Sequence, residues 1–212
     1  GRRVVSALIQ RGADVRAFIR REDAKQLLAP LGVTDFALGT LEDKASLEKA
    51  MQGVDQLLHI CPPMHPQEDN IAKTLIDLCK QLGTRRFILW SVLHPVIGVP
   101  HHRRKLEAEQ YLIESGQTYT ILQPARYMQH LLPIWKNIVE NGEHALPFSV
   151  TSKFSLTDLV DMAEAAASVA TQPGHDFATY QLAAPDALSQ EDCAAILTKL
   201  LGKKITARER NL

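Results

Sequence analysis

The sequence lacks the features that mark several large classes of protein. No apolar run approaches the roughly 18 residues that a membrane-spanning helix needs, so we expect no membrane segment. The first residues, GRRVVSALIQRG, are basic and then only briefly apolar, unlike a secretory signal peptide. Lysine and arginine (24) balance aspartate and glutamate (24), so no global field would attract nucleic acid or an anionic membrane.

Cysteine is also scarce. The three cysteines, Cys61, Cys79 and Cys193, are odd in number and unrelated in spacing, which fits neither a disulfide framework nor a zinc site. The sequence therefore predicts reduced thiols, a cytoplasmic protein and no metal centre.

What the sequence does contain is a regular alternation of two patterns. Hydrophobic residues make up 45%, enough for a globular core. Apolar runs predict strands, and helical spacing predicts the helices between them. The strands are expected at residues 14–20, 34–40, 54–60, 85–92 and 118–124, and the helices near residues 4–10, 22–32, 43–53, 67–82, 101–116 and 126–141. This alternation predicts an α/β fold with a doubly wound, Rossmann-like parallel sheet.

Beyond Pro147 the alternation loosens. Residues 155–171 predict a helix with Ser155 as its N-cap and Asp158 three residues later. Residues 179–205 predict a strand, a turn and a helix. We expect a larger α/β domain over residues 1–132 and a smaller α+β lobe over residues 133–212, partly interleaved with the sheet.

Ligands of open parallel sheets bind at the carboxyl ends of the strands. The residues at these places are Arg20-Arg21, Gly39-Thr40-Leu41, Cys61-Pro62-Pro63, Ser91 and Gln123-Pro124. No acid follows the strand predicted at residues 14–20. An acid there would bind a ribose 2′-hydroxyl, whereas an arginine suits a 2′-phosphate. Arg20 and Arg21 could equally be an exposed surface pair.

The stretch HHRRK, residues 101–105, places basic side chains at the start of a predicted helix, where the helix dipole disfavours them. Lys105, Ala108 and Leu112 fall on one stripe, which we expect to face the sheet. Lys105 is therefore a candidate donor to a ribose hydroxyl, or else a lysine whose stem alone is buried. His102 can exchange a proton near neutral pH, or simply hydrogen-bond within the loop.

Four stretches carry a resemblance to a known family: GRRVVSALIQRGADVRAFIRR, GTLEDKASLEKAMQGVDQLL, SVLHP and KLEAEQYLIESGQTYTILQPARYMQ. Together with SLTDLVDMAEAAASVA and YQLAAPDALSQEDCAAIL, they make nearly the whole sequence similar to NmrA-like members of the atypical short-chain dehydrogenase/reductase superfamily. The resemblance implies that residues 1–132 bind NADP(H), with NAD possible, and that residues 133–212 form a substrate-side lobe.

The resemblance also implies roles for particular residues. Gly1 matches the last glycine of the family's G-x-x-G-x-x-G turn, so the family's first strand and first two glycines would be missing. We expect the place of that strand to lie between the strands that precede Arg20 and Ser91. The cofactor-binding residues predicted on these grounds are Gly1, Arg20, Arg21, Thr40, Leu41, Cys61, Pro62, Ser91, Lys105 and Pro124.

Two functions remain open at this point. The first is an NADPH-dependent reductase that transfers a hydride to a small carbonyl or quinone-type acceptor. Lys105 and His102 are its predicted catalytic residues, with a water as the other proton source. The second is a non-catalytic NADP(H) redox sensor that acts through a protein partner. It is favoured by His101, which stands where related dehydrogenases carry a catalytic tyrosine, whereas the C-terminal lobe favours the reductase. An epimerase of nucleotide sugars is a weaker third interpretation.

Overall fold

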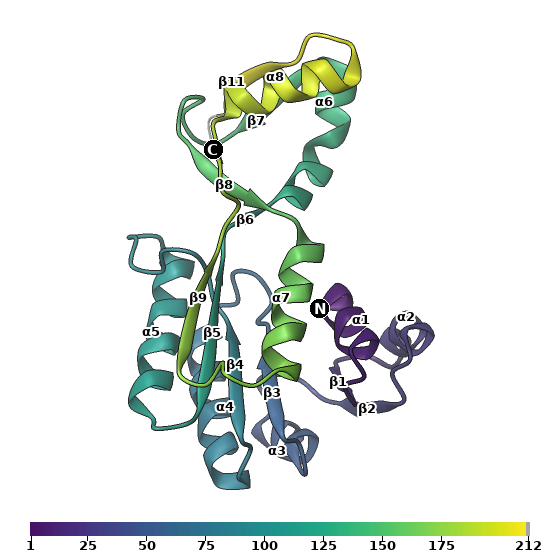
Figure 1. Ribbon diagram of the computed structural model, residues 1–212, viewed down its shortest axis with the longest axis vertical. Coiled ribbons are helices and arrows are strands. Elements are labelled where there is room, and N and C mark those ends of the chain that lie inside the picture. Colours follow the sequence, from purple (N-terminus) through teal and green to yellow (C-terminus); the bar gives the residue numbers. More distant parts are fainter. Residues whose placement is uncertain (211–212) are drawn as a thin grey trace. The chain divides into compact units, whose positions relative to one another are not determined.

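The computed structural model describes residues 1–210 (Figure 1). Its contacts divide the chain into two compact units. Unit 1 comprises Gly1–Pro124 and Val160–Gln181, and unit 2 comprises Ala125–Leu159 and the chain from Leu182 onward. This division differs from the predicted boundary between residues 132 and 133. The chain returns to unit 1 because a late helix and strand pack with the main sheet.

Unit 1 has the alternation that the sequence predicts, and the expected α/β class is confirmed. Its elements are α1 (Arg2–Gln10), β1 (Arg16–Ile19), α2 (Lys25–Leu28), β2 (Asp35–Leu38), α3 (Lys44–Met51), β3 (Gln56–His59), α4 (Glu68–Leu82), β4 (Arg86–Trp90), α5 (Pro100–Glu114), β5 (Tyr119–Pro124), α7 (Leu159–Thr171) and β9 (Ala178–Leu182). The first two strands, β1 and β2, form a parallel pair. The others form a sheet in the order β3-β4-β5-β9, in which β3, β4 and β5 are parallel.

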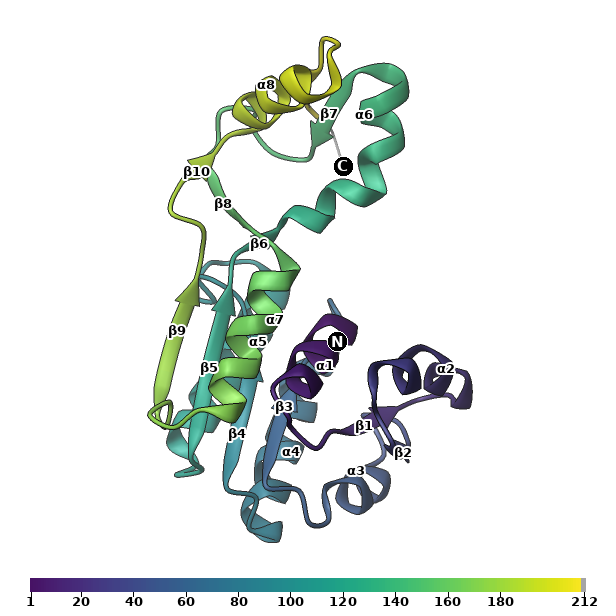
Figure 2. The same cartoon turned by 45° about the vertical axis from the view of Figure 1, so that its right-hand side comes forward.

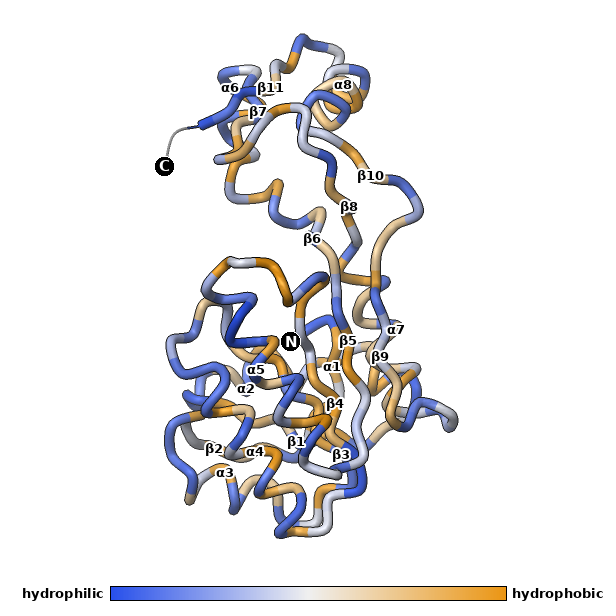
Figure 3. Tube along the Cα trace, turned by 90° about the vertical axis from the view of Figure 1, so that its left-hand side faces the viewer, coloured by the Kyte–Doolittle hydropathy of each residue, from blue (hydrophilic) through white to orange (hydrophobic). Residues whose placement is uncertain are grey.

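The core of unit 1 forms around β4 and β5. Residues throughout β4 are buried, and Figure 3 shows apolar residues along both strands. Phe87 and Ile121 pack in one cluster with Leu75 from α4 and Leu112 from α5. Helices α4 and α5 cover one face of the strands, and Figure 2 shows α1 and α7 on the opposite face. Helices therefore cover both faces, as in a doubly wound sheet.

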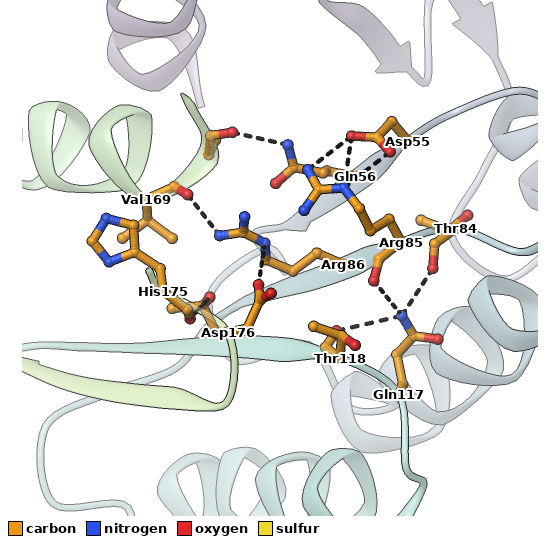
Figure 4. Close-up of polar contacts among 12 residues, drawn as sticks. Asp55, Gln56, Thr84, Arg85, Arg86, Gln117, Thr118, Val169, His175 and Asp176 are labelled. Atoms are coloured by element: carbon orange, nitrogen blue, oxygen red, sulfur yellow. Dashed lines mark hydrogen bonds and ion pairs between the residues drawn. The ribbon is translucent and has the colours of Figure 1, made fainter. Parts of the chain in front are cut away.

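A polar network holds the amino ends of these strands (Figure 4). Arg86, at the start of β4, is only 3% exposed. Its Nη1 donates to the carbonyl of Val169 in α7 at 2.9 Å, and its Nε lies 3.0 Å from Asp176 Oδ1 in the loop before β9. The neighbouring Arg85 pairs with Asp55 at 2.9 Å on the surface. Because Arg86 donates a hydrogen bond to α7 and forms an ion pair with the loop, it fixes the returning segment to the sheet.

Unit 2 has its own small core. Its elements are β6 (Arg126–Tyr127), α6 (Trp135–Asn141), β7 (Glu143–Leu146), β8 (Phe154–Thr157), β10 (Ala187–Leu188), α8 (Gln190–Leu201) and β11 (Thr206–Glu209). Strands β6, β8 and β10 form one sheet, and β7 pairs with β11. Ile138, Ala194, Leu197 and Ile205 form the buried cluster.

The helix predicted over residues 126–141 is wrong in its first half. Residues 126–127 form β6, Met128–Ile134 form a 3₁₀ segment, and only then does α6 begin. Pro133 lies inside the 3₁₀ segment. Proline has no N–H to donate and clashes with the preceding turn, so the α-helix begins after it. Residues 22–32 likewise form α2 between two short 3₁₀ turns, the second of which contains Pro30.

The predicted N-cap at Ser155 is also wrong. Ser155 lies in β8, paired with Ala187 of β10, and α7 begins only at Leu159. The capping box that the structure does contain is at Ser189, whose hydroxyl accepts from the backbone N–H of Asp192 at the start of α8. Both sites show serine followed three residues later by an acid, so the local sequence alone does not separate them.

The predicted place of an additional strand needs correction. Strand β4, which precedes Ser91, has neighbours on both sides, β3 and β5. Among residues 1–210, β1 pairs only with β2 and β3 pairs only with β4, so each of these two strands has an open edge where a further strand could pair. Separately, no helix in the described part of the chain is long and apolar enough to span a membrane.

Candidate active site

The predicted cofactor-binding residues lie at the carboxyl ends of the strands of unit 1. Arg20 and Arg21 follow β1, Thr40 and Leu41 follow β2, Cys61 and Pro62 follow β3, Ser91 follows β4, and Pro124 closes β5. Because neighbouring strands are parallel, these residues gather at one edge of each sheet. Their contact with a cofactor stays a prediction at this point.

A hydrogen bond joins the loops that follow β2 and β3. His65 Nε2 lies 2.9 Å from Glu42 Oε1. A backbone hydrogen bond and then His65 lower the pKa of Glu42, so its carboxylate is ionised at neutral pH. Gly39 lets the first loop approach α3, because a Cβ there would lie 2.4 Å from Ser46 Oγ. The loop that carries Thr40 is therefore fixed on two sides.

Half-buried Lys105 forms an ion pair with a buried acid at this edge. Its Nζ donates to Oε1 of Glu68, which is 4% exposed in the first turn of α4, and also to the carbonyl of Trp90 at 3.4 Å. The helix stripe faces inward as predicted, because Ala108 is 1% and Leu112 0% exposed. An ammonium group has three N–H donors. Two are used, so the third is available to a ligand.

Two neighbours of this pair are uncharged at neutral pH. Burial, and then the charge of Lys105, lower the pKa of His59 to about 4. Burial, and then Glu68, raise the pKa of Cys61 to about 12. A thiol with so high a pKa is a poor nucleophile. Cys61 can therefore line the site but cannot supply a thiolate.

A second buried acid lies one helical turn beyond Lys105. Burial raises the pKa of Glu109, and Gln123 Nε2 donates to both of its carboxylate oxygens, at 3.0 and 2.9 Å. The two hydrogen bonds from Gln123 join α5 to the carboxyl end of β5, and so help to hold the helix that presents Lys105.

His102 lies against the loop between β4 and α5. Its Nδ1 is 3.2 Å from the carbonyl of His94, and its ring is edge-on to His101 with centroids 4.7 Å apart. His94 has φ of 55°, a left-handed conformation that non-glycine residues seldom adopt. The loop hydrogen bond that the sequence allowed is thus present. A proton-transfer role for His102 stays a prediction.

The two arginines after β1 differ. Arg21 Nε lies 3.3 Å from Asp23 Oδ1, whereas no residue in the described chain forms an ion pair with Arg20. Helix α1 begins at Arg2 with Gly1 as N-cap and no side-chain cap. Its first backbone N–H groups are therefore free to bind an anion. A free arginine, an uncapped helix and a lysine donor fit the phosphates and ribose of a dinucleotide.

Sequence reasoning missed the acids of this site. Glu68 stands beside Asp69 in a helical first turn, where acids are ordinary, so its burial gives no sequence signal. Glu109 did carry a signal, because it follows the inward-facing Ala108 and lies four residues after Lys105.

The chain is similar to several known reductases. It is 30% identical over 207 residues to the NAD(P)H azoreductase of Xenophilus azovorans. The aligned region covers 97% of this chain and 71% of the azoreductase. It is 29% identical over 212 residues to quinone oxidoreductase 2 of Escherichia coli strain K12. The aligned region covers 97% of this chain and 72% of the oxidoreductase.

Solved structures of reductases also share the fold of this chain. An Escherichia coli NADPH-dependent quinone oxidoreductase, crystallised with NADPH, superposes with a TM-score of 0.90 at 28% identity over 100% of this chain and 75% of that one. The fold is also that of a Citrobacter triphenylmethane reductase, with a TM-score of 0.87 at 22% identity over 99% and 75% of the two chains. Residues 1–209 match the profile of the NmrA-like family. The chain belongs to the NmrA-like family.

Proposed function

We propose that this protein is an NADPH-dependent reductase that acts on small quinone-type acceptors. The observation that carries the proposal is Lys105, which is held at the carboxyl end of the sheet by buried Glu68 with one N–H free. The two curated relatives that span nearly the whole chain, an azoreductase and a quinone oxidoreductase, support this activity.

Each part of the cofactor has a candidate partner in unit 1. Arg20 binds the 2′-phosphate, the uncapped start of α1 binds the pyrophosphate, and Lys105 donates to a ribose hydroxyl. Bound NADPH supplies the hydride. Selection of NADPH over NADH then depends on Arg20, because NADH has no phosphate at that position.

The chain's own contribution to chemistry is positioning and a proton. Glu68 and the Trp90 carbonyl fix Lys105, so that its remaining donor has a defined direction. Reduction of a quinone oxygen also requires a proton, which we assign to His102 or to a water beside it. The acceptor is a small molecule, and we place the protein in the cytoplasm, where its buried, unpaired Cys61, Cys79 and Cys193 would stay reduced.

The test is a titration followed by a turnover assay. We expect NADPH fluorescence to change on binding, with NADPH preferred over NADH by about tenfold or more. Adding 1,4-benzoquinone should then oxidise NADPH catalytically. NADPH binding without oxidation by quinones, azo compounds or aldehydes would favour the redox sensor. Absence of NADPH binding would reject both functions.

A further inference from the structure

Unit 2 contains a small pocket that the reductase proposal does not use. It is lined by Arg126, Tyr127, His130, Leu131, His144, Leu146, Phe154, Leu156 and Cys193, all of which belong to unit 2. Its free volume of about 10 Å³ is the space that one water-sized group occupies. Most of the walls are apolar, so the few polar groups decide what enters.

The main polar group is an arginine without an acidic partner. The Arg126 guanidinium carbon lies 5.5 Å from the ring centroids of both Phe148 and Phe154. No residue in the described chain forms a side-chain ion pair with Arg126, and none accepts a hydrogen bond from its guanidinium. Burial lowers the pKa of Arg126, which is the expected cost of a cation held in apolar surroundings. Arg126 is half-buried. A cation held partly out of water without an acidic partner is suited to bind an anion.

Neighbouring side chains do not supply that anion. The Cys193 thiol is close to Arg126, but burial raises its pKa, so it is neutral at neutral pH. His144 is 1% exposed, and its Nδ1 is buried with no hydrogen-bond partner in the described chain. Burial lowers the pKa of both His144 and His130, so they are neutral as well. The pocket therefore has one net positive charge and an unused polar atom.

We propose that this pocket binds the carboxylate group of a small apolar acid. A guanidinium presents parallel N–H donors that match the two oxygens of a carboxylate. The free space has room for one of these oxygens, and the ring of Phe154, which lines the pocket, offers an apolar surface to the rest of the acid. All residues that line the site belong to unit 2.

Calorimetry with benzoate tests the proposal. Benzamide is the matched neutral probe, because it has the same shape without the charge. We expect benzoate to bind at least about tenfold more tightly than benzamide at constant ionic strength. Equal binding of the two, or no benzoate binding at millimolar concentrations, would overturn the proposal. Inorganic phosphate binding as tightly as benzoate would overturn the assignment to a carboxylate.

Variants locate the binding in this pocket. Arg126→Gln should abolish the preference for benzoate, and Arg126→Lys, which keeps the charge but not the paired donors, should weaken benzoate binding. Arg208→Gln is the control, because Arg208 is an exposed arginine of the same unit, paired with Glu143 at 2.9 Å. If Arg126→Gln does not fold, Arg126→Lys remains decisive. Unchanged benzoate affinity in Arg126→Lys, or a loss in Arg208→Gln, would contradict the proposal.

Discussion

A cation lies at each end of the strands in unit 1, buried Arg86 at the amino ends and half-buried Lys105 at the carboxyl ends, and the two have different partners. At the amino ends, Arg86 bonds to α7 and pairs with the loop before β9, so it joins segments distant in sequence. At the carboxyl ends, Lys105 pairs with Glu68 and keeps one donor free beside the residues that follow the strands. In this parallel sheet, the cation at the amino ends of the strands is structural, whereas the cation at the carboxyl ends lies where ligands bind.

The largest effect should come from the amino end. Arg86→Leu leaves the Val169 carbonyl without its donor in a buried site, so we expect a loss of about 3 kcal/mol in unfolding free energy. NADPH affinity of the folded variant should be unchanged. Denaturant unfolding and an NADPH titration measure the two quantities. The control is Arg85→Leu, where an exposed pair should cost less than about 1 kcal/mol. A weakened NADPH affinity in folded Arg86→Leu would show that the role of Arg86 is not only structural.

The carboxyl end should show the stronger pH dependence. Burial lowers the pKa of His59 in the folded state to about 4, from 6.5 when unfolded. The unfolded chain therefore binds more protons between these values, and stability is lost as pH falls through this window. We expect His59→Leu to reduce this loss by about 2–3 kcal/mol between pH 7 and pH 4. Unfolding curves at several pH values measure it, and an equally steep loss in the variant would contradict the assignment.

His102 tests whether the carboxyl end performs chemistry. His102→Ala should lower quinone-dependent NADPH oxidation by about a hundredfold while NADPH affinity stays nearly unchanged. The matched control is His101→Ala, because His101 is adjacent and in ring contact with His102. Steady-state rates at saturating NADPH measure the effect. Equal rates for His102→Ala and the native chain would assign the proton to water.

Arg20 should have the smallest effect. Arg20→Ala should reduce the preference for NADPH over NADH by about tenfold, because it removes the guanidinium from the 2′-phosphate. Arg21→Ala should change the preference less, since Arg21 already pairs with Asp23. Paired titrations with the two dinucleotides measure it. An unchanged preference in Arg20→Ala would remove this residue from the site.

The sequence predicted the parts of this fold that depend on periodicity. The strands of unit 1 and the inward stripe with Ala108 and Leu112 follow from apolar spacing, and so do the positions just after each strand. Features that depend on distant partners were missed. Glu68 lies in an ordinary helical first turn, and only the approach of α5 makes it a buried partner of Lys105. Ser155 matches a capping pattern, but pairing with β10 places it in a strand.

Unit 2 was the harder region to predict. Pro133 is visible in the sequence, yet the switch from β6 through a 3₁₀ segment to α6 depends on pairing of Arg126 with Leu156. The residues that line the pocket around Arg126 come from several elements, so no local sequence pattern predicts it.

Lys105 provides the most direct test of the claim that the carboxyl end binds NADPH. Lys105→Ala removes a charged donor from a partly buried site, so we expect the NADPH dissociation constant to rise about ten- to a hundredfold. The double variant Lys105→Ala with Glu68→Gln removes the unpaired carboxylate that the single change leaves behind. The measurement is the NADPH dissociation constant of both variants and of the native protein. Both variants should bind NADPH more weakly than the native protein. Native affinity in Lys105→Ala, or its recovery in the double variant, would show that Lys105 does not bind the cofactor.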